Sequence, residues 1–238
     1  MKLTIIETGL PPEDIRTDWP TYPAMFEALI SEVDSGFTYE TISIVTGAPL
    51  PDPAKLDGVI HTGSAYGVYD DVDWMPALMD FIRTAAQAGI PQFGVCFGHQ
   101  AMAEALGGKV IKSDKGWGVG RHTYETPDRP DWMGSGPDMF SLAVSHQDQV
   151  VAVPDGTRVT ARSNFCEYAG LAYAGGNAAS FQGHPEFSAE FCSALHELRR
   201  ERIGSALVDE ALASFADPLD STHVAKWMAD FFRAERHG

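Results

Sequence analysis

The sequence predicts an α/β fold: a doubly wound, mostly parallel sheet with helices on both faces and an added antiparallel β-hairpin region. Strand-like and helix-like segments alternate over residues 1–110, which is typical of βαβ units. The later segments are short and are separated by Gly, Pro and Asp, which favours antiparallel hairpins. We expect one domain over residues 1–238, with a C-terminal helical extension from about residue 203.

The parallel part of the sheet is predicted from short apolar or alternating runs that stop at turn residues. These strands cover residues 3–6, 39–45, 58–62 and 92–95. Helices are predicted between them where apolar side chains recur at helical spacing, and glycines mark helix ends. These helices cover residues 22–33, 74–88 and 99–106.

The second half of the chain begins with strand-like pieces and ends with helices. The pieces are residues 110–111, 119–125, 142–144, 150–153, 157–161, 168–173 and 179–182. The Pro- and Gly-rich segment 126–138 is expected to be an exposed connection. One apolar helical stripe comprises Phe187, Phe191, Leu195 and Leu198. A last one, capped by Asp220 or Ser221, comprises Val224, Trp227, Met228, Phe231 and Phe232.

The composition limits the partners and the compartment. The chain carries 17 Lys+Arg against 33 Asp+Glu, a net charge of −16, which argues against nucleic acid and anionic membranes as partners. No segment resembles a signal peptide or a membrane span, so a cytoplasmic location is expected. The three cysteines are widely spaced and form neither a disulfide framework nor a CxxC pair.

The strongest motif is Gly-Val-Cys-Phe-Gly-His-Gln at residues 94–100, where a predicted strand runs directly into a helix. A nucleophile flanked by glycine two residues before and after is the pattern of a nucleophile elbow. The helix N-terminus favours the thiolate of Cys96, and the N–H of Phe97 points at an oxyanion formed on an attacked carbonyl. Cys96 is therefore predicted to be a nucleophile rather than a small core residue.

A second motif, His-Pro-Glu at residues 184–186, follows a predicted strand. Pro185 fixes its own φ and biases His184 towards an extended conformation. Glu186 can then hold the imidazole in one tautomer and stabilise the imidazolium, so the segment supplies a base and the group that orients it. By itself this motif also fits a structural histidine.

Other candidate groups are interpreted as structural. His99, His146 and His184 lack carboxylate partners at ligand spacing, so neither a metal nor a cofactor is expected. His146 and Asp148 are expected to shape a pocket wall, whereas Cys166 and Cys192 are expected to be core or half-buried residues.

These motifs together resemble the class I (triad) glutamine amidotransferase family, in the stand-alone form similar to the glutaminase domain of GMP synthase. Two further stretches agree with the resemblance, His-Thr-Gly-Ser-Ala-Tyr-Gly-Val-Tyr-Asp at 61–70 and Val-Ser-His-Gln-Asp-Gln-Val at 144–150. The resemblance runs from about residue 3 to residue 187. It implies a flavodoxin-like sheet and hydrolysis of the side-chain amide of glutamine through a γ-glutamyl thioester.

The resemblance also implies roles for single residues. Cys96 is the nucleophile, His184 the general base and then acid, and Glu186 the residue that orients it. Amide groups of Phe97 and of either Gly63 or Ser64 form the oxyanion hole. Residues that bind the α-amino acid end of the substrate are Gln100, Gln147 and Asp148.

Two positions depart from the family pattern, and the substrate stays open. Ser64-Ala65 stands where Gly-Pro is common, and Gly67 replaces a usual serine. One interpretation is a glutaminase that passes ammonia to an unknown acceptor, such as one on a synthase partner. A second is a γ-glutamyl peptidase acting on γ-glutamyl amides other than glutamine. A third is a catalytically silent binding or regulatory module.

Overall fold

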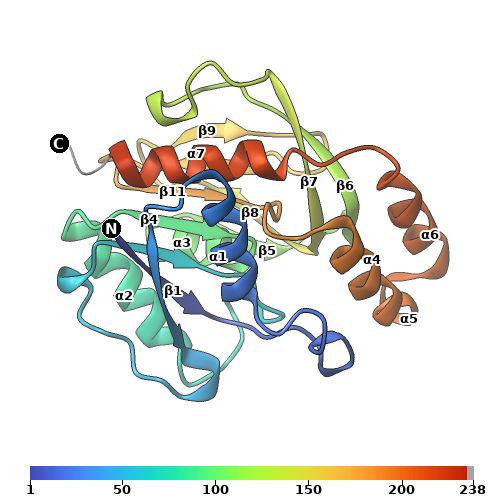
Figure 1. The fold of residues 1–238 in the computed structure, drawn as a ribbon, viewed down its shortest axis with the longest axis horizontal. Coiled ribbons are helices and arrows are strands. Elements are labelled where there is room, and N and C mark those ends of the chain that lie inside the picture. The colour runs from blue at the N-terminus through green and yellow to red at the C-terminus, as the bar shows by residue number, and fades with distance from the viewer. Residues whose placement is uncertain (235–238) are drawn as a thin grey trace.

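A twisted seven-stranded sheet runs through the centre of the molecule, in the order β2-β1-β3-β4-β11-β10-β9 (Figure 1). The computed structural model describes residues 1–234. The neighbouring strands from β2 to β11 pair in parallel, whereas β10 is antiparallel to both β11 and β9. The strands are β1 (Lys2–Glu7), β2 (Thr38–Ser43), β3 (Gly58–His61), β4 (Gln92–Val95), β9 (Arg158–Ala161), β10 (Gly170–Ala172) and β11 (Ala178–Phe181).

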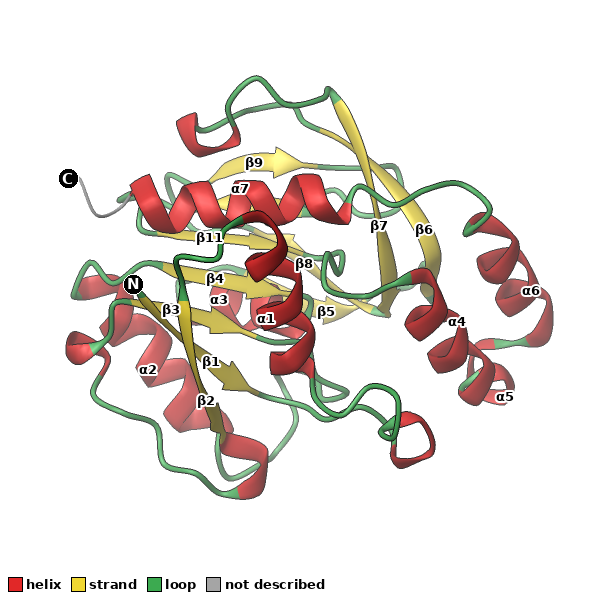
Figure 2. Cartoon of the chain, in the orientation of Figure 1, coloured by secondary structure: helices red, strands yellow, loops and turns green. Residues whose placement is uncertain are grey.

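Helices cover both faces of this sheet, so the predicted doubly wound architecture is confirmed (Figure 2). On one face lie α1 (Tyr22–Val33) and α7 (Ser221–Ala234), and on the other lie α2 (Met75–Gln87) and α3 (Phe97–Ala105). Side chains alternate between the faces along each strand. Leu3 and Ile5 pack with α1 and α7, whereas the next residue, Ile6, packs with α2.

Two antiparallel pairs lie outside the main sheet. The first joins β5 (Lys109–Lys112) to β8 (Asp148–Ala152), and the second joins β6 (Gly118–Glu125) to β7 (Met139–His146). The predicted strand β11 is more than a hairpin strand. It pairs antiparallel with β10 on one side and parallel with β4 on the other. This pairing brings the end of β11 next to the end of β4.

Two details of the sequence prediction are wrong. Segment 126–138 is not simply exposed, because it forms a short 3₁₀ turn, Asp131–Met133, whose Trp132 and Met133 are buried in the core beside α7. Leu198, assigned to an apolar stripe, is 45% exposed at the end of α4 (Ala189–Leu198). The loop is partly buried because Trp132 packs into the aromatic core, and Leu198 is exposed because it is the last residue of α4.

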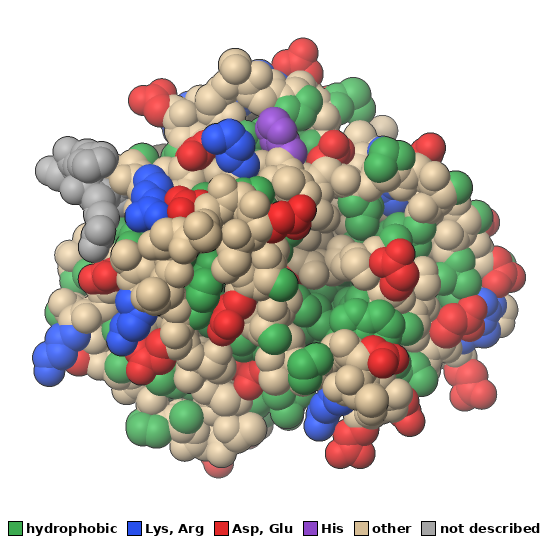
Figure 3. Space-filling view, viewed as in Figure 1, with side chains coloured by type: hydrophobic (Ala, Val, Ile, Leu, Met, Phe, Trp, Pro, Cys, Tyr) green, Lys and Arg blue, Asp and Glu red, His purple; other side chains and the backbone are tan. Residues whose placement is uncertain are grey.

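The remaining helices are α5 (Arg200–Ile203) and α6 (Ser205–Ser214), which follow α4 at one end of the molecule (Figure 1). The single domain and its helical extension remain predictions, and residues 235–238 of that extension lie outside the described part. Within residues 1–234 no helix is both long and apolar enough to cross a bilayer. Acidic side chains are spread over the face in Figure 3 rather than gathered in one patch.

Candidate active site

Cys96 occupies the corner between β4 and α3. Its backbone has φ 54° and ψ −104°, and it is the one non-glycine residue with positive φ in the described part of the chain. Such a conformation costs an ordinary residue about 1–3 kcal/mol, and in native proteins it clusters at functional sites. The side chain is 5% exposed and lines two adjoining cavities.

The flanking glycines are required by close backbone contacts. A Cβ atom at Gly94 would lie 2.5 Å from the carbonyl oxygen of Gly98, and one at Gly98 would collide with the carbonyl of His61. The Gly98 N–H also donates to the carbonyl oxygen of Thr62, at 3.1 Å. The first turn of α3 is thus packed tightly against the end of β3. The N–H of Phe97 lies in this first turn, where the helix itself offers no hydrogen-bond acceptor.

His184 and Glu186 form a buried pair just after β11. The Nδ1–H of His184 donates to Oε1 of Glu186 at 2.7 Å, and the two side chains are 3% and 0% exposed. The backbone N–H of His184 donates to Ala143 on β7, and its ring stacks on Phe187. Burial by itself would lower the pKa of His184, but the charges of Glu186 and Cys96 outweigh it and raise the pKa to about 10.

The side chains of Cys96 and His184 meet beside Gly63. A Cβ at Gly63 would lie 2.9 Å from Cε1 of His184 and 3.7 Å from Cβ of Cys96. Both side chains also line a cavity of about 20 Å³. A nucleophilic sulfur, an imidazole and a carboxylate are therefore brought together from the ends of β4 and β11, which are neighbours in the sheet.

The loop after β3 is anchored to Thr8. The hydroxyl of Thr8 donates to the carbonyl oxygens of Thr62 and Gly63, at 3.0 and 3.2 Å, and Ser64 Oγ donates back to the Thr8 carbonyl at 2.6 Å. These bonds fix the directions of the Thr62 and Gly63 carbonyls. Because a trans peptide points its N–H opposite to its C=O, the N–H of Ser64 faces away from Thr8.

A wider pocket of about 310 Å³ opens from Cys96. All three residues predicted to bind the substrate's amino acid end, Gln100, Gln147 and Asp148, line it. The side-chain nitrogen of Gln100 donates to the carbonyl of Asp148 at 2.9 Å, and the Tyr69 hydroxyl donates to Oδ1 of Asp148 at 3.0 Å. The structure thus joins α3, β8 and the loop after β3 in one pocket wall.

Gly67, at the position where the resemblance implies a serine, lies in a crowded part of that wall. A Cβ at this position would lie 2.8 Å from the Tyr69 ring and 2.9 Å from Oδ2 of Asp148. Tyr69 therefore occupies the space that a serine side chain would take, and it supplies a hydroxyl to Asp148 in its place.

His146 lines the wide pocket together with Asp148, as expected, whereas His99, Cys166 and Cys192 are buried outside it. His99 Nδ1 lies 2.8 Å from Ser180 Oγ, and His146 Nδ1 lies 3.1 Å from the Asp148 carbonyl. Burial lowers the pKa of both imidazoles to about 3. Cys166 and Cys192 are fully buried, and burial raises the pKa of both thiols.

Comparison with known proteins identifies the family. The sequence model described as Glutamine amidotransferase class-I matches residues 42–191, more than half of the chain. This chain belongs to the class-I glutamine amidotransferase family. The matched range includes Cys96, His184 and Glu186.

Relatives of this chain carry several names. A glutamine amidotransferase-like protein of Schizosaccharomyces pombe is 26% identical over 96% of this chain and 97% of its own. Gamma-glutamyl peptidase 3 of Arabidopsis thaliana is 28% identical over 85% and 82% of the two chains. A glutamine-hydrolyzing GMP synthase subunit of Halobacterium salinarum is 30% identical over 61% and 75%.

Solved structures agree on the fold. A glutamine amidotransferase from Thermotoga maritima superposes with a TM-score of 0.78 at 18% identity, covering 100% of this chain and 99% of that one. One from Methylobacillus flagellatus gives a TM-score of 0.75 at 21% identity, covering 99% and 92%. The flavodoxin-like sheet with extra antiparallel strands is thereby confirmed.

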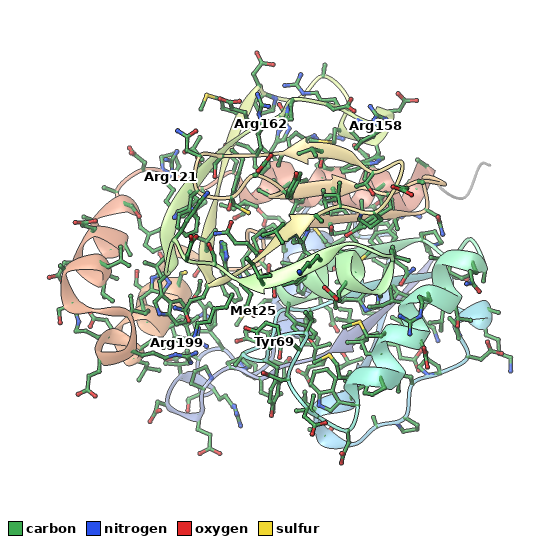
Figure 4. The ribbon with its side chains drawn as sticks, turned by 180° about the vertical axis from the view of Figure 1, so that it is seen from behind. Met25, Tyr69, Arg121, Arg158, Arg162 and Arg199 are labelled. Atoms are coloured by element: carbon green, nitrogen blue, oxygen red, sulfur yellow. The ribbon has the colours of Figure 1, made fainter. Side chains whose placement is uncertain are left out.

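Sequence reasoning misses several residues of this candidate site. It assigns Phe187 only to a helical stripe, and it does not single out Tyr69, Ser145 or Arg199. Figure 4 labels Tyr69 on the loop after β3 and Arg199 at the junction of α4 and α5, and both residues line the wide pocket. Tyr69 and Ser145 lie inside the motif stretches 61–70 and 144–150, and Phe187 lies close to His184, but no local signal in the sequence marks Arg199.

Proposed function

We propose that this amidotransferase hydrolyses γ-glutamyl amide bonds, with glutamine as the simplest substrate, through a covalent thioester on Cys96. The observation that carries the proposal is the strained corner that holds Cys96 at the start of α3, beside the buried His184–Glu186 pair. Nucleophile, base and orienting group within reach of one another are what acyl transfer by a thiol requires.

In the first step the sulfur of Cys96 attacks the γ-carbonyl carbon. The raised pKa of His184 keeps the imidazole protonated at neutral pH, and in the proposed step the sulfur attacks as a thiolate beside this imidazolium. When the tetrahedral intermediate collapses, the C–N bond breaks and the imidazolium gives its proton to the departing nitrogen. The products of this step are ammonia and a γ-glutamyl thioester.

The negative oxygen of the intermediate needs N–H donors, and we assign these to Phe97 and Ser64. The Phe97 N–H lies at the start of α3 beside the sulfur. The carbonyl of Thr62 accepts from the Gly98 N–H as well as from Thr8, which turns the Gly63 N–H away from α3. The Gly63 carbonyl accepts from the Thr8 hydroxyl, which turns the Ser64 N–H away from Thr8. These orientations favour Ser64 over Gly63.

In the second step water cleaves the thioester. Neutral His184 removes a proton from water as the oxygen bonds to the γ-carbon, and the C–S bond breaks to release glutamate and the thiolate. Glu186 stabilises the imidazolium formed again at this point. The α-amino acid end of the substrate is assigned to the wall formed by Gln100, Gln147 and Asp148, where the Asp148 carboxylate offers an acceptor for an ammonium group.

A second candidate is the same chemistry on γ-glutamyl peptides. The wide pocket beside Cys96 favours it, because it leaves room beyond a glutamine-sized ligand, and some relatives are named gamma-glutamyl peptidases. If glutamine is the substrate, the released ammonia goes to water or to an acceptor on a synthase partner; relatives named as GMP synthase subunits motivate this last option.

The test compares ammonia release from glutamine with cleavage of γ-glutamyl peptides, for the wild type, Cys96→Ala and the control Cys192→Ala. We expect turnover of at least one substrate by the wild type and the control, and none by Cys96→Ala. A glutamine-like chloroketone should label the wild type at Cys96 alone. A wild-type chain that cleaves neither substrate and resists labelling would support a silent binding module instead.

A further inference from the structure

Two arginines of the wide pocket have no acidic partner. Arg199 and Arg202 both line it, and among residues 1–234 neither takes part in an ion pair. Arg200, between them, is paired with Glu197 and Asp209 at 2.8 and 2.7 Å. In a chain with 33 acidic and 17 basic residues, two neighbouring guanidinium groups without an acid are unusual. Asp70 and Asp148 also line the pocket, but guanidinium groups recognise carboxylates well, so the part of the pocket beside the two arginines suits an anion.

Arg199 is the deeper of the two. It is half-buried after the end of α4, and its Nη1 donates to Ser145 Oγ at 3.1 Å. Burial lowers the pKa of Arg199, and the positive charge of Arg202 lowers it further. The nearby Tyr22 and Cys96 side chains each have the opposite effect, which is smaller than that of burial. An anion bound between the two guanidinium groups would relieve both unfavourable effects.

Arg202 stands nearer to solvent and is held by an aromatic ring. Its guanidinium carbon lies 5.0 Å from the centroid of the Trp117 ring, which also lines the pocket. A third cation, Lys112, is less available, because it faces Asp148 across the β5–β8 register. The unbalanced positive charge of the pocket therefore lies with Arg199 and Arg202.

The position of His184 decides which part of the substrate lies near Arg199. The departing nitrogen must lie beside His184, which donates the proton to it. The cavity that His184 lines has a volume of about 20 Å³, enough for a group the size of water or ammonia. Arg199 and Ser145 line both this cavity and the wide pocket, so a larger leaving group must extend past Arg199.

The opposite end of the substrate has a different environment. Gln100 and Asp148 line the wide pocket but not the cavity beside His184. They are therefore suited to the glutamyl end, whereas Arg199 is at the boundary that the leaving group crosses.

We propose that Arg199, assisted by Arg202, binds a carboxylate carried by the amine that leaves the γ-glutamyl group. The inference rests on the proposed function and narrows it: γ-glutamyl amino acids and peptides are preferred over γ-glutamyl amides with an uncharged leaving group. Arg199 is then a specificity-determining residue for the leaving group and has no role at the glutamyl end.

The experiment uses two substrates of nearly equal size, γ-glutamylglycine and γ-glutamylethylamide, which differ by one carboxylate in the leaving group. The variants are Arg199→Met, Arg199→Lys and the control Arg200→Met. Arg200 pairs with acidic side chains and does not line the pocket, so its variant should retain activity on both amides. Thermal unfolding checks that each variant folds.

For Arg199→Met we expect kcat/KM for γ-glutamylglycine to fall about 10- to 100-fold, the value of a hydrogen-bonded charge. The kcat/KM for γ-glutamylethylamide should not change. For γ-glutamylglycine, kcat/KM of Arg199→Lys should lie between the values of the wild type and Arg199→Met. An equal fall on both amides would overturn the inference, since Arg199 would then act on the thiolate or the glutamyl end. No fall on either would overturn it as well. A wild type that cleaves glutamine but neither amide would overturn the inference and leave the proposed function intact. A wild type that cleaves neither glutamine nor either amide refutes the proposed function itself, and both results appear before any arginine variant is assayed.

Discussion

The imidazole of His184 lies flat against the phenyl ring of Phe187, with centroids 3.8 Å apart and planes 5° from parallel. Glu186 holds the edge of the same imidazole, so the ring is fixed both in its plane and against tilting. Phe187 is itself buried in a small aromatic cluster with Tyr22 and Phe191. A base held in this way reaches the sulfur without first having to be ordered.

Replacing Phe187 with Leu should impair catalysis more than folding. Removing the stacked ring frees the imidazole to tilt, so we expect kcat to fall about tenfold with little change in KM. The loss of the aromatic contact should cost about 1 kcal/mol of unfolding free energy. Steady-state kinetics and denaturant unfolding measure both. Phe191→Leu is the control, because Phe191 packs on Phe187 but not on His184; similar kinetic losses in the two variants would contradict the positioning role.

Cys96→Gly should be inactive and more stable than Cys96→Ala. Alanine keeps the strained positive φ, whereas glycine relieves it, so the glycine variant should gain about 1 kcal/mol over alanine after its backbone entropy is deducted. Urea unfolding of the two variants measures the difference. At Cys192, inside α4, the order should reverse because glycine weakens an ordinary helix. The same order at both sites would mean that the corner stores no strain.

Glu186→Gln should shift the basic limb of the pH–rate profile to lower pH. The amide oxygen can still accept from Nδ1, but the charge that raises the pKa of His184 is lost, so the imidazolium is lost earlier as pH rises. The free energy of unfolding should depend on pH in the same direction. The contribution of a raised histidine pKa is complete below about pH 6.5 and disappears as pH rises towards about 10.

The wild type should therefore exceed Glu186→Gln in unfolding free energy most near pH 6.5, and the difference should shrink as the pH rises towards about 10. Unfolding at several pH values, together with a pH–rate profile, provides the measurement. A stability difference that grows with pH would show that the assigned sign is wrong.

Thr8→Val should lower kcat while leaving KM almost unchanged. The hydroxyl of Thr8 holds the Gly63 carbonyl, and with it the direction of the Ser64 N–H that we assign to the oxyanion. Because an oxyanion exists only after attack, we expect a fall of about 10- to 100-fold in kcat. Thr4→Val on the preceding strand is the control, since its buried hydroxyl makes no hydrogen bond in the described structure. Unchanged kcat in Thr8→Val would rule out this orientation of the loop.

Gly98→Ala should disrupt the corner itself. The added methyl group would collide with the carbonyl of His61, so α3 must move away from β3, at a cost of about 1–3 kcal/mol and most of the activity. Gly47→Ala provides the comparison: Gly47 has φ 90° and open space around it, so only backbone strain of about 1–2 kcal/mol applies there. Equal activity of the two variants would mean that the contact between α3 and β3 is dispensable.

Local sequence predicted the parts of the site that lie close together along the chain. The glycines around Cys96 are needed within a single turn, and His184 and Glu186 are separated by one residue, so their pattern is recognisable without the fold. The antiparallel additions were predicted only as a class. That β11 pairs with β4 depends on long-range register, which short strand-like runs do not specify.

The sequence by itself determined the alternation of strands and helices, the elbow at Cys96 and the chemistry of the residues that meet there. The tertiary structure alone decided which residues surround them: the ring under His184, the threonine behind the loop after β3, and the arginine at the boundary of the two cavities. The physical reason is that bond geometry and sterics act over a few residues, whereas packing joins β1, α4 and β11 across the whole length of the chain.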